Sequence, residues 1–135
     1  MSSNGLKANS ANGFAVSADV DKLLNDYTVE MKRNAMNIFD TVAKEAVQQL
    51  KATSPKSEKG KHSGDYAKGW AVKRQHDRTK GLATITVHNR THYQLTHLLE
   101  YGHDLPQGGR AKAQPHIEKV ETWSQNEVVR RLEQL

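Results

Sequence analysis

The sequence predicts an α+β fold: a long N-terminal helix packed on a small antiparallel sheet (a β-hairpin), with a short central helix and a C-terminal helix. Three observations support this class. An apolar residue recurs at every third or fourth position between residues 20 and 50, which is the spacing of an amphipathic helix. Two stretches around Trp70 and Ile85 instead alternate apolar and polar residues, which is typical of strands. Helical spacing then returns twice, after Tyr93 and after Pro115.

The composition restricts the class of protein. The chain has 135 residues, which suits one domain, and no cysteine, which excludes a disulfide framework and any thiolate site. No apolar run approaches the roughly 20 residues needed to span a bilayer, and the N-terminus lacks the apolar region of a signal peptide. We therefore expect a protein synthesised in the cytoplasm, with no membrane partner.

The first element is expected to be a helix over residues 18–53, preceded by a flexible arm over residues 1–17. The arm is small and polar, and Ser17 or Asp19 can cap the helix. A helix of this length would measure about 50 Å, whereas a compact domain of this size has a diameter of roughly 26 Å. We therefore expect one end to project towards a neighbour, and the single domain to span residues 18–135.

Positive charge is concentrated in the middle of the chain. The net charge is +5, and residues 51–80 hold nine Lys or Arg residues against three acidic ones. Pro55 ends the first helix, and residues 54–65 are expected to form a mobile basic loop. Such a cluster attracts an anionic partner such as DNA, but a solvated loop explains it equally well.

The strands are expected to form a hairpin with one buried face. Trp70 and Val72 lie on the first strand, residues 76–81 form the turn, and Ile85 and Val87 lie on the second strand. A lone hairpin is marginally stable in water, so this one must lie on the long helix or join other strands.

Two helices follow, separated by a loop. Residues 93–101 place Leu95, Leu98 and Leu99 at helical spacing, and these leucines are expected to bury the short helix. A helix from Pro115, in the first turn, to about Leu132 is expected to bury one apolar face. Residues 103–113 between the helices are expected to be a loop or a loop with a short strand.

Glu100 is the one carboxylate whose position requires a partner. It lies near the end of the central helix, where the helix dipole disfavours negative charge. A cation is expected to pair with it, with Arg110 and His116 as candidates; alternatively, Glu100 is simply exposed.

The chain shows no motif of a common enzyme class. Five histidines fall between residues 88 and 116, but their spacing does not match the zinc metalloprotease pattern. The phosphate-loop, dinucleotide and serine-hydrolase motifs are also absent. The sequence therefore predicts no catalytic residue, no metal and no cofactor. A histidine-based metal enzyme is the third and weakest alternative.

A set of short motifs carries a family resemblance. Residues 93–103 form an apolar helix that ends in Leu-Glu-aromatic-Gly, a Gly- and Arg-containing loop follows, and a Pro-His step opens the last helix. This order resembles the minor tail-component family of siphophages, which comprises tail-completion and head–tail joining (neck) proteins. The residues that carry the motifs are Leu99, Glu100, Gly102, Gly108, Gly109, Arg110, Pro115, His116 and Ile117.

The resemblance implies a structural assembly protein of the virion and not an enzyme. It implies a ring, most simply of six copies, between the head connector and the tail tube, with connector and tail-tube or terminator proteins as partners. Lys56, Lys59 and Lys61 could then face the lumen and make non-specific contact with genome DNA. The main alternative is a small, basic, non-specific DNA-binding accessory protein.

Overall fold

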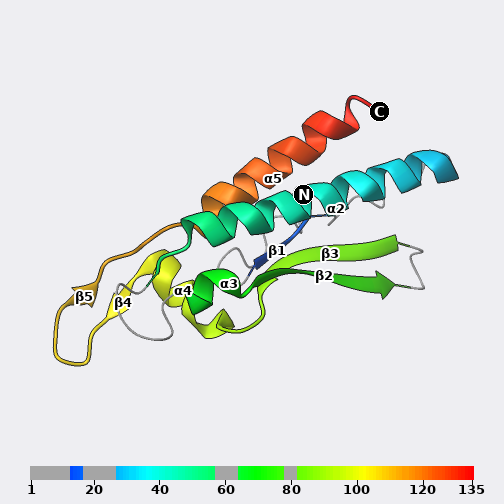
Figure 1. Cartoon of the computed structure of the whole chain (residues 1–135). Helices are drawn as coiled ribbons and strands as arrows, with labels where there is room; N and C mark the ends of the chain where they lie inside the picture. The colour runs from blue at the N-terminus through cyan, green and yellow to red at the C-terminus, as the bar shows by residue number, and fades with distance from the viewer. Residues whose placement is uncertain (1–12, 17–26, 57–63, 78–81) are drawn as a thin grey trace.

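The computed structural model describes residues 13–16, 27–56, 64–77 and 82–135, and within these ranges the chain has an α+β fold (Figure 1). A long helix, α2, lies beside the C-terminal helix α5 and above a small sheet, and a second, two-stranded sheet lies at one end. The elements are β1 Gly13–Ala15, α2 Val29–Thr53, α3 Asp65–Lys68, β2 Trp70–Asp77, β3 Leu82–Asn89, α4 Tyr93–Tyr101, β4 His103–Asp104, β5 Arg110–Ala111 and α5 Ile117–Leu132.

The larger sheet has the order β1-β3-β2, with both pairings antiparallel. The predicted hairpin is confirmed: β2 pairs with β3, and Val72 lies opposite Val87. The third strand was not expected, because residues 1–17 were predicted to be a flexible arm. That prediction is wrong for residues 13–16, since Phe14 pairs with Val87 and both Phe14 and Val16 are buried. Residues 1–12 and 17 lie outside the described part of the chain.

Helix α2 forms the centre of the core, because it packs against both the sheet and α5. Its buried positions repeat at helical spacing and include three alanines, which allow close approach of neighbouring backbones. A bidentate ion pair between Arg131 of α5 and Glu45 of α2 crosses the helix pair at its edge. The buried positions of α2 are Ala35, Phe39, Val42, Ala43, Ala46, Val47 and Leu50.

Helix α2 begins later than the apolar pattern predicts. Thr28 has extended backbone angles, and its hydroxyl accepts a hydrogen bond from the Met31 N–H, so Thr28 is the N-cap. A continuous helix from residue 18 is therefore wrong, and the expected caps at Ser17 and Asp19 lie outside the described residues. The 25 residues of α2 span about 37 Å. Its first turns still project beyond the other described elements (Figure 1).

The remaining helices differ from expectation mainly in which residues they bury. Helix α4 has the predicted bounds, but Leu95 and Leu98 are exposed, while Thr96 and Glu100 are buried. The prediction that the leucines bury this helix is therefore wrong for Leu95 and Leu98, whereas Leu99 is partly buried and packs against the core. Pro115 lies before the N-cap of α5 and not in its first turn. Between the helices, β4 and β5 pair as a small hairpin, which confirms a short strand in this loop.

Candidate functional site

The motif residues meet where the end of α4 reaches the start of α5. The Glu100 carboxylate is buried, with 3 % of the residue exposed, and it accepts three backbone hydrogen bonds from the first residues of α5. Oε1 accepts from the N–H groups of His116 (2.8 Å) and Ile117 (2.9 Å), and Oε2 accepts from that of Glu118 (3.1 Å). These N–H groups have no partner within the helix, and the helix dipole favours negative charge there. Glu100 therefore caps α5 from another helix.

Of the two side chains predicted to pair with Glu100, Arg110 is wrong, whereas His116 lies against the carboxylate. Arg110 instead donates to the Asp104 carboxylate and to the Tyr101 carbonyl. His116 does lie beside the carboxylate, with Nδ1 3.3 Å from Oε1, but Nδ1 is also 2.8 Å from the Gln114 carbonyl. Because the positive end of α5 supplies the donors, the carboxylate is satisfied without an Arg or Lys side chain.

His116 joins this cap to the rest of the core. Its Nε2 lies 2.7 Å from the Tyr66 hydroxyl. A neutral imidazole that donates from Nδ1 to the Gln114 carbonyl accepts from the Tyr66 O–H at Nε2. Burial and, to a smaller extent, the Glu100 charge raise the pKa of Tyr66 above its usual range, so the phenol remains a donor. The Tyr66 ring also makes edge-on contacts with His116 and Trp70.

Two further buried polar side chains hold the neighbouring segments. Asn89 donates from Nδ2 to the Tyr66 carbonyl (2.7 Å) and accepts at Oδ1 from the His92 N–H (2.9 Å). Trp70 donates its indole N–H to the Ser54 hydroxyl at 2.8 Å. A Cβ at Gly69 would lie 2.2 Å from the Thr91 hydroxyl oxygen, so a larger residue there would displace the Thr91 and Asn89 side chains. No local pattern singles out Asn89 or Tyr66, because these two residues and His116 lie far apart in the chain.

The glycines of the motif have two different roles. Gly102, which ends α4, has a φ of +77°, and a Cβ there would lie 2.6 Å from the Ala111 carbonyl. Gly108 and Gly109 also have positive φ but lie at the tip of the β4–β5 hairpin, with no atom within 4 Å of a Cβ built on either one. Gly102 therefore shapes the junction, whereas the pair shapes only the turn.

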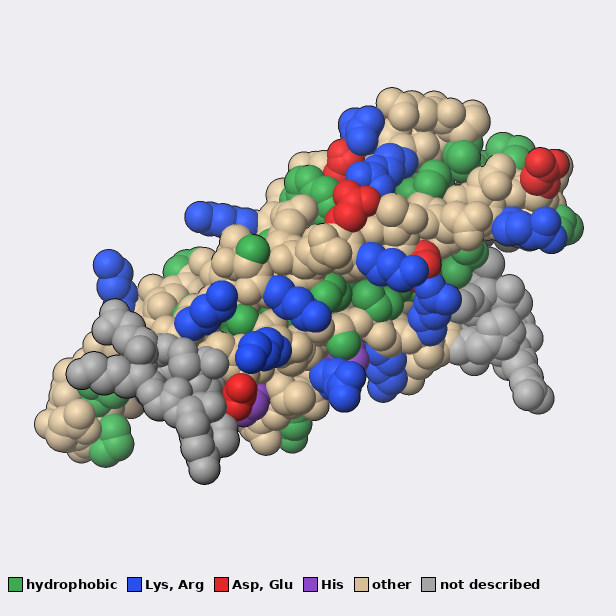
Figure 2. All heavy atoms as spheres, in the orientation of Figure 1, with side chains coloured by type: hydrophobic (Ala, Val, Ile, Leu, Met, Phe, Trp, Pro, Cys, Tyr) green, Lys and Arg blue, Asp and Glu red, His purple; other side chains and the backbone are tan. Residues whose placement is uncertain are grey.

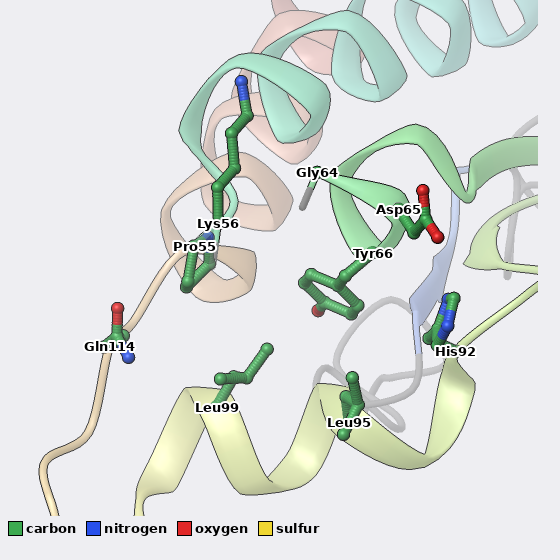
Figure 3. Close-up of a pocket in the computed structure, with 9 residues that line it drawn as sticks. All are labelled: Pro55, Lys56, Gly64, Asp65, Tyr66, His92, Leu95, Leu99 and Gln114. Carbon is green, nitrogen blue, oxygen red and sulfur yellow. The ribbon is translucent and has the colours of Figure 1, made fainter. Parts of the chain in front are cut away.

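A cavity of about 370 Å³ lies beside this junction (Figure 3). Leu95 and Leu99 of α4 form one side, and Tyr66 and Asp65 of α3 face them across the opening. Of the predicted lysines, Lys56 lies at the rim, while Lys59 and Lys61 lie outside the described residues. The remaining lining residues are Pro55, Gly64, His92 and Gln114.

The histidines do not gather into a metal site in the part of the chain that the structure describes. Within these ranges no group of three or more His, Asp or Glu side chains could hold a metal ion. No helix in the part of the chain that the structure describes is long and apolar enough to cross a membrane.

A family model with the description "Bacteriophage HK97-gp10, putative tail-component" matches residues 15–102, well over half of the chain. The chain belongs to this HK97-gp10-like family. The match covers α2, the hairpin and α4 up to Gly102, so Glu100 lies inside it and the residues from Gly108 to Ile117 lie beyond it. No curated protein and no solved structure matches the chain.

Membership of the HK97-gp10-like family supports a structural role in a bacteriophage tail, and hence a place in the virion. A structural tail component is not an enzyme class. The geometry of the Glu100 junction is in keeping with this role, because its hydrogen bonds join α4, α5 and α3 to one another.

Proposed function

We propose that this HK97-gp10-like protein is a tail-completion or head–tail joining subunit that acts in a ring between the head connector and the tail tube. The observation that carries the proposal is the family match over α2, the hairpin and α4. The buried polar groups at the Glu100 junction support it, because they fix the relative positions of helices and leave a rigid body suited to docking.

The exposed face of α4 is the first docking surface in this proposal. We define the α4 face as Tyr93, Leu95, Leu98 and Tyr101, which are 61, 37, 38 and 47 % exposed. The helix has no Lys or Arg, and its one carboxylate, Glu100, is buried. Uncharged, apolar side chains that remain in water on one helix mark an interaction surface.

A ring requires one patch to meet a different patch on the next copy. The start of α2 lies at the end of the molecule opposite to α4 (Figure 1). Val29, in the first turn of α2, is 75 % exposed and offers an apolar contact there. In the proposal, the α4 face of one copy meets the projecting end of α2 on the next, or one of the two meets the docking platform.

The remaining assignments belong to the same proposal. The single domain extends to residue 135, the ring has six copies, and its partners are the connector and the tail-tube or terminator proteins. Lys56, at the rim of the cavity, and Lys59 and Lys61 contact genome DNA in the lumen. The protein is made in the host cytoplasm and then becomes part of the virion neck.

Deletion of the gene in the phage that encodes it tests the proposal. We expect filled heads and separate tails to accumulate without joining, and a plasmid copy of the gene to restore joined virions. Electron microscopy of negatively stained lysates counts the three kinds of particle. In restored virions, gold-labelled antibody against a tagged copy should lie at the head–tail junction.

Two results would contradict this role. Joined, infectious virions in the deletion strain would show that the protein is not needed for completion. Antibody label along the tail tube or at the distal tip would place the protein in another part of the tail.

A further inference from the structure

Lysine and arginine side chains gather on one face of the molecule, over α2, α3 and the hairpin (Figure 2). We define the basic face as six residues with exposed side chains: Lys44, Lys51, Lys68, Lys73, Arg74 and Arg90.

Contacts between elements place Lys44, Lys51 and Arg74 beside one another at the edge of the molecule formed by β2 and α2. Asp40 of α2 forms ion pairs with Lys44 on its own helix and with Arg74 on β2. Lys51 lies seven residues after Lys44, two helical turns along the same side of α2. The ion pair between Asp40 and Arg74 therefore places this side of α2 next to β2.

The other cations continue the surface around this edge. Lys73 directly precedes Arg74 on the edge strand β2, so its side chain leaves the opposite face of the sheet but borders the same edge. Lys68 ends α3, which packs against α2, and it directly precedes Gly69. The Gly69 carbonyl accepts from the Arg90 N–H at 2.9 Å, so Lys68 and Arg90 lie near one another. His88 lies opposite Ala71, on the same side of the sheet as Lys73. Burial, followed by the charges of Lys73 and Arg90, lowers the pKa of His88.

Apolar anchors are missing from the basic face. Every large apolar side chain that is exposed among the described residues belongs to α2's first turn, α4, or the last turns and end of the C-terminal segment. Protein interfaces are depleted of lysine and depend on buried aromatic or aliphatic anchors. A surface of exposed lysines without anchors instead suits a polyanion with regularly spaced charges.

We propose that the basic face binds the phosphodiester backbone of nucleic acid without reading its sequence. Lysine ammonium groups act as point charges on phosphates, and such contacts carry no base information. Asp40 holds Arg74 and Lys44 in place while 56 and 68 % of their side chains remain exposed to a ligand. This surface goes beyond the three loop lysines of the proposed function, and its test does not depend on ring formation.

Fluorescence anisotropy with a labelled 20-base-pair DNA duplex tests this inference on the purified full chain. We expect binding that weakens steeply between 50 and 200 mM salt, with a log–log slope of about −0.9 per phosphate contact. Replacing Lys51, Lys68 and Lys73 by Gln should weaken binding at least tenfold and reduce the slope by roughly three.

The matched control replaces Lys112, Lys119 and Arg130 by Gln, which removes the same charge from exposed positions outside the basic face. This control should keep most of the affinity and slope. Equal weakening by the two triple variants, or an absence of duplex binding at 50 mM salt, would overturn the inference. Circular dichroism of both variants separates lost binding from lost folding.

Further ligands identify the chemistry that is recognised. A single-stranded RNA of equal length should also bind in a salt-dependent manner, because the phosphodiester is shared. Binding to vesicles of phosphatidylglycerol but not to the duplex would count against nucleic acid. A phage that carries the Lys51, Lys68 and Lys73 variant reports on assembly separately, so loss of duplex binding with normal virions leaves the joining role intact.

Discussion

Replacing Glu100 by Gln tests whether one buried carboxylate holds α5 in place. The amide keeps an oxygen that can accept from the His116 and Ile117 N–H groups, but the negative charge is lost. In the parent protein the Glu118 N–H donates to Oε2 at 3.1 Å, and in the variant an NH₂ group takes the place of this oxygen. A charge at a partly buried helix end contributes up to about 2 kcal/mol. A lost charged hydrogen bond costs about 1.5 to 3 kcal/mol, offset in part by the easier burial of a neutral group. We expect a net loss of about 2 to 3 kcal/mol.

Urea unfolding followed by the fluorescence of Trp70 and Trp123 measures this loss. The midpoint should fall by roughly 0.7 to 3 M with an unchanged slope, because slopes for small proteins in urea are about 1 to 3 kcal/mol per M. The matched control is Glu118→Gln, which neutralises an exposed carboxylate in the first turn of α5. It should cost less than about 1 kcal/mol. A Glu100→Gln protein within about 0.5 kcal/mol of the parent, or a Glu118→Gln protein that loses as much, would refute the reasoning.

Three other substitutions give independent tests. Tyr66→Phe should cost about 1 kcal/mol at pH 7. Because the folded pKa of Tyr66 lies above the unfolded value of about 10, the parent should also lose stability as the pH rises past 10. Urea midpoints measured from pH 7 to 10.5 should therefore fall less for the variant than for the parent. Gly69→Ala should cost about 1 to 3 kcal/mol, since its Cβ would meet the Thr91 and Asn89 oxygens at 2.2 and 2.5 Å; adding Thr91→Ala should restore only part of the loss, and a neutral Gly69→Ala would contradict the packing. Leu98→Asp should leave the urea midpoint nearly unchanged but reduce the yield of joined virions. Asn126→Asp, at an exposed position of α5 away from the α4 face, should not reduce it, and a normal yield for Leu98→Asp would remove the α4 face from the docking surfaces.

The hairpin and the positions of α4 and α5 could be predicted because their signals are local. Trp70, Ile85 and Val87 alternate with polar neighbours, and the structure buries all three. The start of α2 could not be found in this way, because the apolar spacing continues on both sides of Thr28. A threonine within a helical pattern looks ordinary, and only its extended backbone and its bond to Met31 reveal a cap.

Strand β1 and the Glu100 cap depend on contacts between distant parts of the chain. Phe14 pairs with Val87, and a three-residue strand has no periodicity to detect. Glu100 was correctly expected to need a positive partner, but the helix N-terminus was not considered as that partner. One local signal was available: α5 starts after His116, without a Ser, Thr, Asp or Asn cap, so its N–H groups needed an acceptor from elsewhere.

The β4–β5 hairpin offers a practical handle on the intact particle. Its base is fixed, since the Gln114 N–H donates to the Leu99 carbonyl at 2.7 Å, while Gly108 and Gly109 at its tip have open space around them. A short epitope or a fluorophore-binding peptide inserted between these glycines would leave both helices attached as they are. The hairpin can therefore carry a reporter that locates the subunit in the virion while the α4 face and the start of α2, the two surfaces proposed for docking, keep their sequence.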